Sequence, residues 1–577
     1  MNEAYFLTSL TNAINLANSN QINLSKKKLL IITDKISVSN YLKKKNIKNV
    51  ICLDEKYLGL KRKKSFIKHY KYFDKLLNNL GNKNKIQFKN IYLNSIYNTF
   101  ACDLPRLYAG VRFLLGALDD LIYKKGLKKV VYFDDFEHLF LKKIFYFKIF
   151  EWYFEKKKIE FVSFKKNNFL KKNFLNKQTL FAKLIFIFQE FNFNLLIIKI
   201  KKILSTILFF YDKKNIIIEP ACDLNYSNFN PANTKFIELN YVLLKKYNLI
   251  CKTTDNFEKE KFKSLDNIFI SYILNINSNL ENYLLETKKI LEQKINLNKV
   301  QKIYWGQSPN YLLRNLVIFL KKNKEIYGVQ HGGSYFVTEK DILHRSSDYF
   351  FCDKFLSYGS SRNFNKKKYL KNTKLLKIGS LKESYNSKIL KKITTNNNKI
   401  LYIPTILNYF FKPNFQSSQT ERLKYQVQIC DILNNQKNYK SYIKVLPNSF
   451  YKKNKYNYTN LELNPIHLEI SKFRNLNINQ NTLLTAVKKL KPKIIICDFF
   501  TTPVYELSNL NSEIILLIDK TNKPKKDVLK SLKKRCYIIS SPNEINSTIK
   551  KINSNKINKI NNDFYELFYK NKKNYFI

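Results

Sequence analysis

The stretch LTAVKKLKPKIIICDFFTTPVYELSNLNSEIILLID, residues 484–519, contains the pattern that decides the fold. An amphipathic segment leads into the apolar run KIIIC, a polar turn follows, and a second helical segment leads into the apolar run EIILLID. Short apolar runs that alternate with helical segments are typical of parallel strands covered by helices on both faces. The stretch therefore predicts an α/β unit built on a parallel sheet.

The alternation of strand and helix patterns continues on both sides of this stretch. Apolar runs of the same character occur in the second half of the chain at ILYIPT (400–405), YKSYIKVLP (439–447) and CYIISS (536–541). Further runs occur in the first half at KKLLIITD (27–34), NVICLD (49–54), KKVVYFDD (128–135), KIYWG (302–306) and EIYGVQHGG (325–333). We therefore expect two doubly wound α/β domains that face each other across a cleft.

The chain has 577 residues, more than a single hydrophobic core accommodates, so we expect more than one domain. Residues 1–380 are predicted to form an N-terminal α/β domain, with an insertion at about residues 165–265 where the alternation breaks. The polar, Asn-rich segment 381–399 is predicted to be a linker. Residues 400–577 are predicted to form the second domain, which ends in a polar helical tail.

The charge balance is strongly basic. Lysine and arginine number 103 and aspartate and glutamate 44, which gives a formal net charge of +59. Nucleic acid, anionic lipid and acidic substrates all attract such a chain. The basic residues are spread along the sequence rather than gathered in a tail, which argues against a nucleic-acid-binding arm. We interpret most lysines as a solvated surface and expect no nucleic acid partner; a non-catalytic nucleic-acid-binding protein is the alternative to an enzyme.

Membrane contact is a separate question. The first residues lack a basic segment ahead of an apolar core, and no run reaches the roughly 18 apolar residues of a membrane span. The most apolar stretch, residues 180–211, is interrupted by lysines. It fits a buried helix pair and equally a helix in the membrane interface. We expect a cytoplasmic protein that associates peripherally with the inner face of the plasma membrane.

Ligands of doubly wound sheets bind at the carboxyl ends of the strands, so the segments that follow strands are the candidate site. The sharpest signal is QHGGSY, which comprises Gln330, His331, Gly332, Gly333, Ser334 and Tyr335. Paired glycines let backbone N–H groups approach a ligand closely. The imidazole of His331 can serve as a general base or donate a hydrogen bond to a phosphate. The alternative is a tight turn with a surface histidine.

The second signal is the segment DFFTTPVYE, which follows the strand KIIIC. Hydroxyls at a strand-to-helix turn, here Thr501 and Thr502, can hold a phosphate or cap the helix. Asp498 opens this segment. Glu506 can accept hydrogen bonds from ribose hydroxyls, or its charge can complement the helix dipole.

Further candidates occur at other strand ends and on helices. Lys444 ends a strand and can bind a phosphate or remain solvated. Asp134 and Asp135 can activate an acceptor hydroxyl, bind a cation or cap a helix. Arg314 and Arg345 can neutralise a pyrophosphate or form ordinary ion pairs.

Three of these features together resemble bacterial surface-polysaccharide transferases. They are QHGGSY after a strand, YIPT at the opening of the second domain, and the late pattern ICDxxTTxxxE. The chain is most similar to the O-antigen and surface-carbohydrate transferase family. It is more distantly similar to capsule polysaccharide transferases and to the CDP-glycerol glycerophosphotransferases of teichoic acid synthesis. The resemblance covers roughly residues 300–520.

This resemblance implies a GT-B fold of two Rossmann-type domains, with the acceptor on the N-terminal side. A nucleotide-activated sugar or polyol donor would lie mainly on the C-terminal domain, without a cofactor or an obligatory metal. The motifs map to His331 and Gly332, and to Asp498, Thr501, Thr502 and Glu506. Leu446 stands where related enzymes often have histidine. The implied activity is sugar transfer to a glycan or lipid-linked glycan acceptor of O-antigen or capsule; polyol-phosphate transfer is the alternative.

Overall fold

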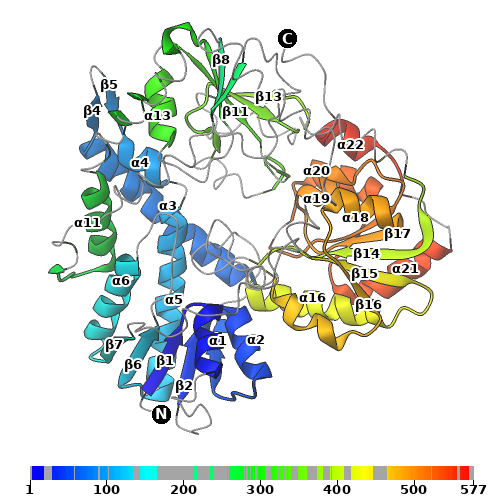
Figure 1. The fold of residues 1–577 in the computed structure, drawn as a ribbon, viewed down its shortest axis with the longest axis horizontal. Helices are drawn as coiled ribbons and strands as arrows, with labels where there is room; N and C mark the ends of the chain where they lie inside the picture. The colour runs from blue at the N-terminus through cyan, green and yellow to red at the C-terminus, as the bar shows by residue number, and fades with distance from the viewer. Residues whose placement is uncertain are drawn as a thin grey trace.

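The computed structural model describes most of the chain. The described residues are 3–18, 29–56, 59–88, 91–101, 103–133, 143–164, 214–218, 234–237, 257, 259–277, 280, 284–285, 288–289, 292, 296–305, 313–321, 324–330, 332–333, 335–338, 348–359, 373–380, 390, 393–407, 418–445, 464–521, 523–554 and 559–570. Within these ranges the chain forms three parallel sheets, each in a separate part of Figure 1.

The N-terminal unit, residues 3–164, contains a five-stranded sheet in the order β3-β2-β1-β6-β7. Its strands are β1 (Glu3–Leu7), β2 (Leu30–Thr33), β3 (Val50–Cys52), β6 (Lys129–Phe133) and β7 (Glu160–Phe164). The helices and the short 3-10 turn around it are α1 (Leu10–Asn18), α2 (Ile36–Lys44), η1 (Leu53–Lys56), α3 (Gly59–Lys83), α4 (Ser95–Phe100), α5 (Leu104–Lys125) and α6 (Lys143–Lys156). A two-stranded antiparallel hairpin is formed by β4 (Ile86–Phe88) and β5 (Ile91–Leu93).

The middle unit, residues 214–380, contains a six-stranded sheet in the order β13-β12-β11-β10-β8-β9. Its strands are β8 (Asn215–Ile218), β9 (Thr234–Ile237), β10 (Lys302–Trp305), β11 (Glu325–Val329), β12 (Lys354–Ser357) and β13 (Lys374–Lys377). This part of the chain also contains α11 (Leu265–Asn277) and α13 (Leu313–Leu320), and α11 packs against α6 and α4 of the N-terminal unit (Figure 1). Numbered along the chain, the strand order is 2-1-3-4-5-6, which is a doubly wound arrangement.

The C-terminal unit, residues 393–570, contains a six-stranded sheet in the order β16-β15-β14-β17-β18-β19. Its strands are β14 (Asn396–Ile403), β15 (Lys440–Lys444), β16 (Leu476–Asn479), β17 (Pro492–Cys497), β18 (Glu513–Leu517) and β19 (Cys536–Ile539). Its helices include α16 (Gln419–Asn434), α18 (Leu483–Leu490), α19 (Thr502–Glu506), α20 (Lys526–Arg535), α21 (Ile545–Asn553) and α22 (Asp563–Phe568), and a 3-10 turn, η8, spans Pro465–Leu468. The strand order is 3-2-1-4-5-6 along the chain, the dinucleotide-fold order, with its reversal point between β14 and β17.

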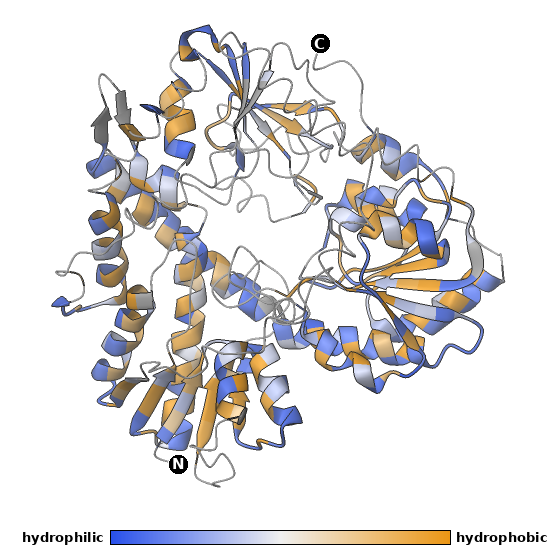
Figure 2. Cartoon of the chain, in the orientation of Figure 1, coloured by the Kyte–Doolittle hydropathy of each residue, from blue (hydrophilic) through white to orange (hydrophobic). Residues whose placement is uncertain are grey.

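The apolar strand runs explain why these sheets are buried on both faces. Ile494, Ile495 and Ile496 of β17 are all fully buried, although consecutive residues point to opposite faces of a sheet. Figure 2 shows the same hydrophobic character along the strands of the C-terminal sheet, with hydrophilic residues on the surrounding helices. The α/β class with parallel sheets, and the pairing of two doubly wound sheets expected of a GT-B-like fold, are confirmed in the middle and C-terminal units.

The N-terminal half contains one more parallel sheet than the sequence patterns distinguished. Strands of the region 1–380 divide between two sheets, and β8 and β9 of the sheet in the middle unit lie within residues 165–265. The physical reason is that apolar runs identify strands but not their neighbours. A single hydrophobic cluster, extending from Ala4 to Cys352, joins the N-terminal and middle units through their helices.

The helical tail returns to the middle unit. The backbone N–H of Ser380 donates to the carbonyl of Tyr569 at 2.8 Å. The ring of Tyr569 lies 5.6 Å from that of Tyr358, centroid to centroid. A Cβ atom on Gly359 would lie 2.8 Å from the carbonyl oxygen of Leu567, so the close packing of the tail requires glycine there.

Within the described ranges, no helix has both the length and the apolar composition needed to cross a membrane. The apolar stretch 180–211 lies outside the described residues.

Candidate functional site

The middle and C-terminal units meet through segments that follow strands. The backbone N–H of Gly333, in the segment after β11, donates to the Thr502 hydroxyl at 2.9 Å. Lys525, in the segment after β18, donates from its backbone N–H to the carbonyl of Val337 at 2.9 Å and from its ammonium to the carbonyl of Phe336 at 2.6 Å. The carboxyl ends of the two sheets therefore lie against each other, where doubly wound sheets bind their ligands.

The glycine pair allows this contact. A Cβ atom on Gly333 would lie 2.5 Å from a ring carbon of Tyr505 and 3.0 Å from the backbone nitrogen of Thr502. A Cβ atom on Gly332 would lie 2.9 Å from the Thr502 hydroxyl. Neither glycine has a positive φ, so the backbone conformation does not require them. The close approach of α19 requires them, and α19 occupies the space beside the glycines in which the motif predicts a ligand.

Gln330 positions the segment that contains the glycines. Its side-chain N–H donates to the carbonyl of Gly332 at 2.5 Å, and its side-chain oxygen accepts from the backbone N–H of Tyr358 at 3.0 Å. The side chain is buried. Both ends of the amide therefore have protein partners, and Gln330 connects the segments after β11 and β12.

Asp498 lies at the reversal point of the C-terminal sheet and is buried. One carboxylate oxygen accepts from the Thr405 N–H at 2.8 Å; the other accepts from the Tyr402 hydroxyl and the Gln426 amide, both at 3.0 Å. Burial raises the pKa of Asp498, whereas the Arg422 guanidinium and these hydrogen bonds lower it. The carboxylate therefore joins β14, β17 and α16, and its predicted contact with a donor stays a prediction.

No sequence motif indicated Arg422, which is the buried cation of this network. It donates to the carbonyl of Asp498 at 2.6 Å and to the carboxylate of Asp519 at 2.9 Å. Its guanidinium lies 4.6 Å from the ring centroid of Phe499. The one sequence signal in this region is the pattern that starts α16, where Ser418 and Glu421 form a reciprocal capping box.

Three candidates remain at the carboxyl edge with groups that can bind a ligand. Thr501 is the residue before the first turn of α19, but its side chain makes no capping hydrogen bond, so the capping interpretation is not supported. Lys444 ends β15 and is partly buried. Burial lowers the pKa of Lys444, and the nearby Glu506 carboxylate raises it. Lys444 and Glu506 therefore lie close enough for their charges to interact, although they are far apart in the sequence.

Arg314 lies elsewhere. It is fully buried on α13, where it donates to the carbonyl of Asn98 at 3.4 Å and lies 6.0 Å from the ring centroid of Phe350. The arginine connects α13 to α4 of the N-terminal unit, because the shared core of the two units encloses it. Arg314 therefore links two units, and its predicted contact with a pyrophosphate stays a prediction.

The remaining predicted residues lie outside the described part of the chain. They are His331, Ser334, Arg345, Asp134 and Asp135. Among the described residues, no group of three or more His, Cys, Asp or Glu side chains is arranged to hold a metal ion.

Comparison with known proteins finds likeness at the level of structure. No protein family and no curated protein matches the sequence. A sucrose-phosphate synthase from Thermosynechococcus elongatus aligns with a TM-score of 0.34 and 9% identity, covering 66% of this chain and 90% of that one. A variant of the wall teichoic acid polymerase TagF aligns with a TM-score of 0.31 and 14% identity, covering 68% and 93%. MnaA of S. aureus with UDP aligns with a TM-score of 0.32 and 9% identity, covering 62% and 93%. The fold class rests on the strand orders of this chain.

Proposed function

We propose that the chain is a glycosyltransferase that moves a sugar from a nucleotide-activated donor to an acceptor of bacterial surface polysaccharide. The observation that carries this proposal is the chemistry at the carboxyl edge of the C-terminal sheet. There a cation (Lys444), a carboxylate (Glu506) and a hydroxyl without a capping role (Thr501) converge on a sheet of dinucleotide-fold order. These groups suit a diphosphate and a ribose.

The donor would lie on the C-terminal unit. The Thr501 hydroxyl would donate to a phosphate oxygen, and the Lys444 ammonium would balance the diphosphate charge. An anion beside Lys444 favours its protonated form, which opposes the effect of burial on its pKa. Glu506 would accept from ribose hydroxyls. Gly333 and the middle unit would cover the site from the acceptor side, excluding water from the reacting bond.

His331 would act as the general base. In this mechanism the acceptor hydroxyl oxygen forms a bond to the anomeric carbon of the donor sugar. The bond between that carbon and the phosphate oxygen breaks, and its electron pair leaves with the nucleoside diphosphate. His331 takes the proton of the acceptor hydroxyl. Asp134 and Asp135 remain candidates for activating the acceptor hydroxyl, and Ser334 and Arg345 remain candidates for binding the donor.

The acceptor would be a glycan or lipid-linked glycan at the inner face of the plasma membrane. The net charge of +59 would attract the protein to anionic headgroups there. This charge alone does not distinguish lipid from nucleic acid, so salt dependence has to be measured with both.

A binding screen with UDP, CDP, GDP and their sugar or polyol conjugates tests the proposal. Stabilisation by one nucleoside diphosphate and its sugar conjugate at near-physiological salt is the expected result. A preference for CDP-glycerol would instead indicate polyol-phosphate transfer, and tight binding of oligonucleotides alone would contradict both. With the donor known, His331→Ala should lower turnover about 10²–10⁴-fold while donor affinity is retained. Unchanged turnover would remove His331 from the mechanism.

A further inference from the structure

The N-terminal unit contacts the C-terminal unit at the start of α16. The backbone N–H of Thr420 donates to one carboxylate oxygen of Asp54 at 3.0 Å. The guanidinium of Arg62 donates to the other oxygen at 2.6 Å. Asp54 is fully buried, and Arg62 is nearly so. One carboxylate of the N-terminal unit therefore binds a cation of its own unit and the first turn of a helix in another.

The start of α16 offers backbone donors to an acceptor such as Asp54. The first N–H groups of a helix have no partner within the helix, and the aligned peptide dipoles place partial positive charge there. The capping box of Ser418 and Glu421 satisfies part of this requirement, and Asp54 supplies the acceptor for Thr420. A second hydrogen bond crosses nearby, from the backbone N–H of Ile36, the first residue of α2, to the side chain of Gln419 at 3.4 Å.

Helix α16 also contacts Asp498 at the reversal point of the C-terminal sheet. Arg422 donates to the carbonyl of Asp498, and Gln426 donates to its carboxylate. Both residues lie within two turns of Thr420 on α16. Asp498 in turn accepts from the Thr405 N–H and precedes Thr501 by three residues. Hydrogen bonds at each end and the backbone of α16 between them therefore connect Asp54 to the segment that contains Thr501.

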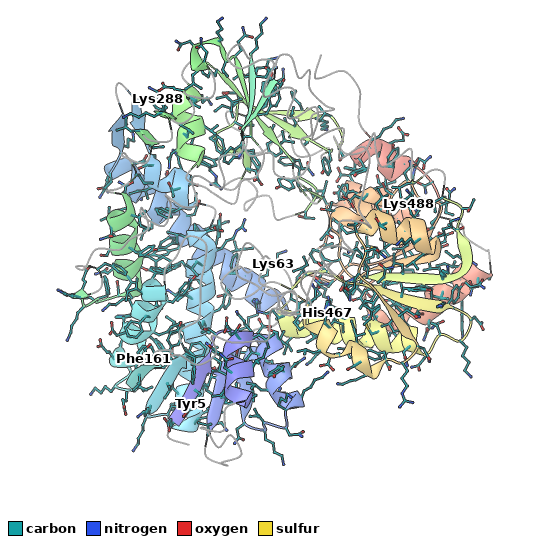
Figure 3. All side chains as sticks on the ribbon, in the orientation of Figure 1. Tyr5, Lys63, Phe161, Lys288, His467 and Lys488 are labelled. Atoms are coloured by element: carbon teal, nitrogen blue, oxygen red, sulfur yellow. The ribbon has the colours of Figure 1, made fainter. Side chains whose placement is uncertain are left out.

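We infer that Asp54 is a positioning residue for nucleotide binding, which acts from the N-terminal unit through α16 on the donor site. The inference rests on the proposed function, since it assigns the donor to this edge of the sheet. The inference also assigns a function to the N-terminal unit, which is to orient α16. That unit shares its core with the middle unit and orients the first turn of α16 at a second edge of the C-terminal unit. Figure 3 labels Lys63 and His467 in the part of the molecule where the N-terminal and C-terminal units adjoin.

Apolar packing across the same contact provides a matched control. Ile36 and Cys52 belong to a hydrophobic cluster with Leu423 and Ile466 of the C-terminal unit, and Leu468 packs against a cluster of the N-terminal unit. Leu468→Ala should loosen this packing while the bond between Asp54 and Thr420 stays in place. The change in nucleotide affinity of Leu468→Ala therefore reports the consequence of weaker packing between the two units while the Asp54 carboxylate is unchanged.

Two double variants isolate the hydrogen bond, because removing Asp54 alone would leave Arg62 buried without its partner. Asp54→Leu/Arg62→Met removes the charge pair and the acceptor for Thr420. Asp54→Asn/Arg62→Met removes the charge pair but retains a side-chain oxygen that can accept from Thr420. Titration calorimetry with UDP and CDP, together with donor kinetics once the donor is known, compares these variants with wild type and with Leu468→Ala.

We expect the Leu/Met variant to raise the nucleotide Kd and the donor KM at least about fivefold, with a smaller change in kcat. The Asn/Met variant should recover most of this loss, and Leu468→Ala should stay near wild type. Hydrogen exchange at the Thr405 amide, which needs no ligand, should accelerate in the Leu/Met variant alone.

The possible failures are distinguishable. Wild-type protein that binds none of UDP, CDP and GDP would overturn the proposed function, and exchange at Thr405 would still decide whether Asp54 controls the segment. Wild-type binding with an unchanged Kd in the Leu/Met variant would overturn the inference alone. An equal loss of affinity in Leu468→Ala would also overturn it, because Asp54 would then serve only to dock the units.

Discussion

The backbone N–H of Gly333 lies 2.9 Å from the hydroxyl oxygen of Thr502, and this hydrogen bond joins two residues that are 169 positions apart. It connects the segment after β11 of the middle unit to the first residue of α19 in the C-terminal unit. The two motifs that stood out in the sequence, QHGGSY and DFFTTPVYE, therefore form one contact. QHGGSY supplies Gly333, which has no side chain to block α19, and DFFTTPVYE supplies the Thr502 hydroxyl that accepts the hydrogen bond.

Substitution of Gly333 by alanine should disrupt this contact. The added Cβ would lie 2.5 Å from the Tyr505 ring and 3.0 Å from the Thr502 backbone nitrogen, and a backbone atom cannot rotate away. We expect a loss of about 1–3 kcal/mol in the free energy of unfolding, measured by urea denaturation. Gly332→Ala is the control, because its Cβ meets only the Thr502 hydroxyl at 2.9 Å, and it should cost less. Equal losses in the two variants would contradict the steric argument.

Lys444→Met should separate stability from nucleotide binding. Burial lowers the pKa of Lys444, so the protonated form is less favourable in the folded protein than in the unfolded chain. The contribution of this group to stability therefore falls as the pH drops through its folded pKa, and it is fully present only above the unfolded value of about 10.4. At pH 7 the neutral variant should be at least as stable as wild type in thermal denaturation.

Binding should change in the opposite direction. Loss of the ammonium should weaken UDP or CDP about tenfold or more in titration calorimetry, because it removes a charge-assisted contact to phosphate. Lys488→Met, an exposed lysine on α18, is the matched control and should bind as wild type does. A Lys444→Met protein that unfolds more easily and binds normally would assign the lysine a purely structural role.

His467 should make the protein sensitive to mild acid. Burial lowers the pKa of His467 to about 4, below its ordinary value near 6.5. Between these two pH values the unfolded chain binds a proton that the folded protein excludes. The contribution of His467 to the free energy of unfolding is therefore present above the unfolded pKa and is lost as the pH falls toward about 4. Lowering the pH from 7 to 5 should cost about 2 kcal/mol through this group.

The variant His467→Asn tests this assignment. Urea denaturation at pH 7 and pH 5 should show a smaller loss of stability in the variant than in wild type, because asparagine does not titrate. Since η8, which contains His467, contacts α2, the acid-sensitive region should include the junction with the N-terminal unit. An identical pH dependence in the two proteins would exclude His467 as the source.

Arg422→Met should destabilise the C-terminal unit strongly. The substitution leaves the buried Asp519 carboxylate without the guanidinium that lies 2.9 Å away, and it removes the donor to the Asp498 carbonyl. Breaking a buried ion pair in this way costs about 3–5 kcal/mol. The double variant Arg422→Met/Asp519→Asn should recover part of the loss, and a double-mutant cycle in urea measures the coupling. Additive losses would show that the two residues do not act as a pair.

Local patterns determined the secondary structure of the C-terminal unit. The runs KIIIC and EIILLID were predicted as strands, and β17 and β18 occupy those positions. Strand ends also located candidate residues, because ligand groups in a doubly wound sheet have to follow its strands. On this basis alone Lys444, Thr501 and Glu506 were selected, and the structure places all three at one edge of the same sheet.

Tertiary structure decided which strands share a sheet, which side chains are buried, and which residues distant in the sequence contact each other. The amino-acid sequence by itself located five of the six strands of the C-terminal sheet and the polar groups that follow them, but its apolar runs did not include β1, β7 or β16. Only packing decided that the first 380 residues form two sheets, that Arg314 is enclosed in a shared core, and that the paired glycines accommodate α19. Only packing likewise surrounded Asp498 with three donors from two other elements. The physical reason is that apolar periodicity and strand ends are local properties, whereas burial, close contact and hydrogen bonding depend on which surfaces the folded chain brings together.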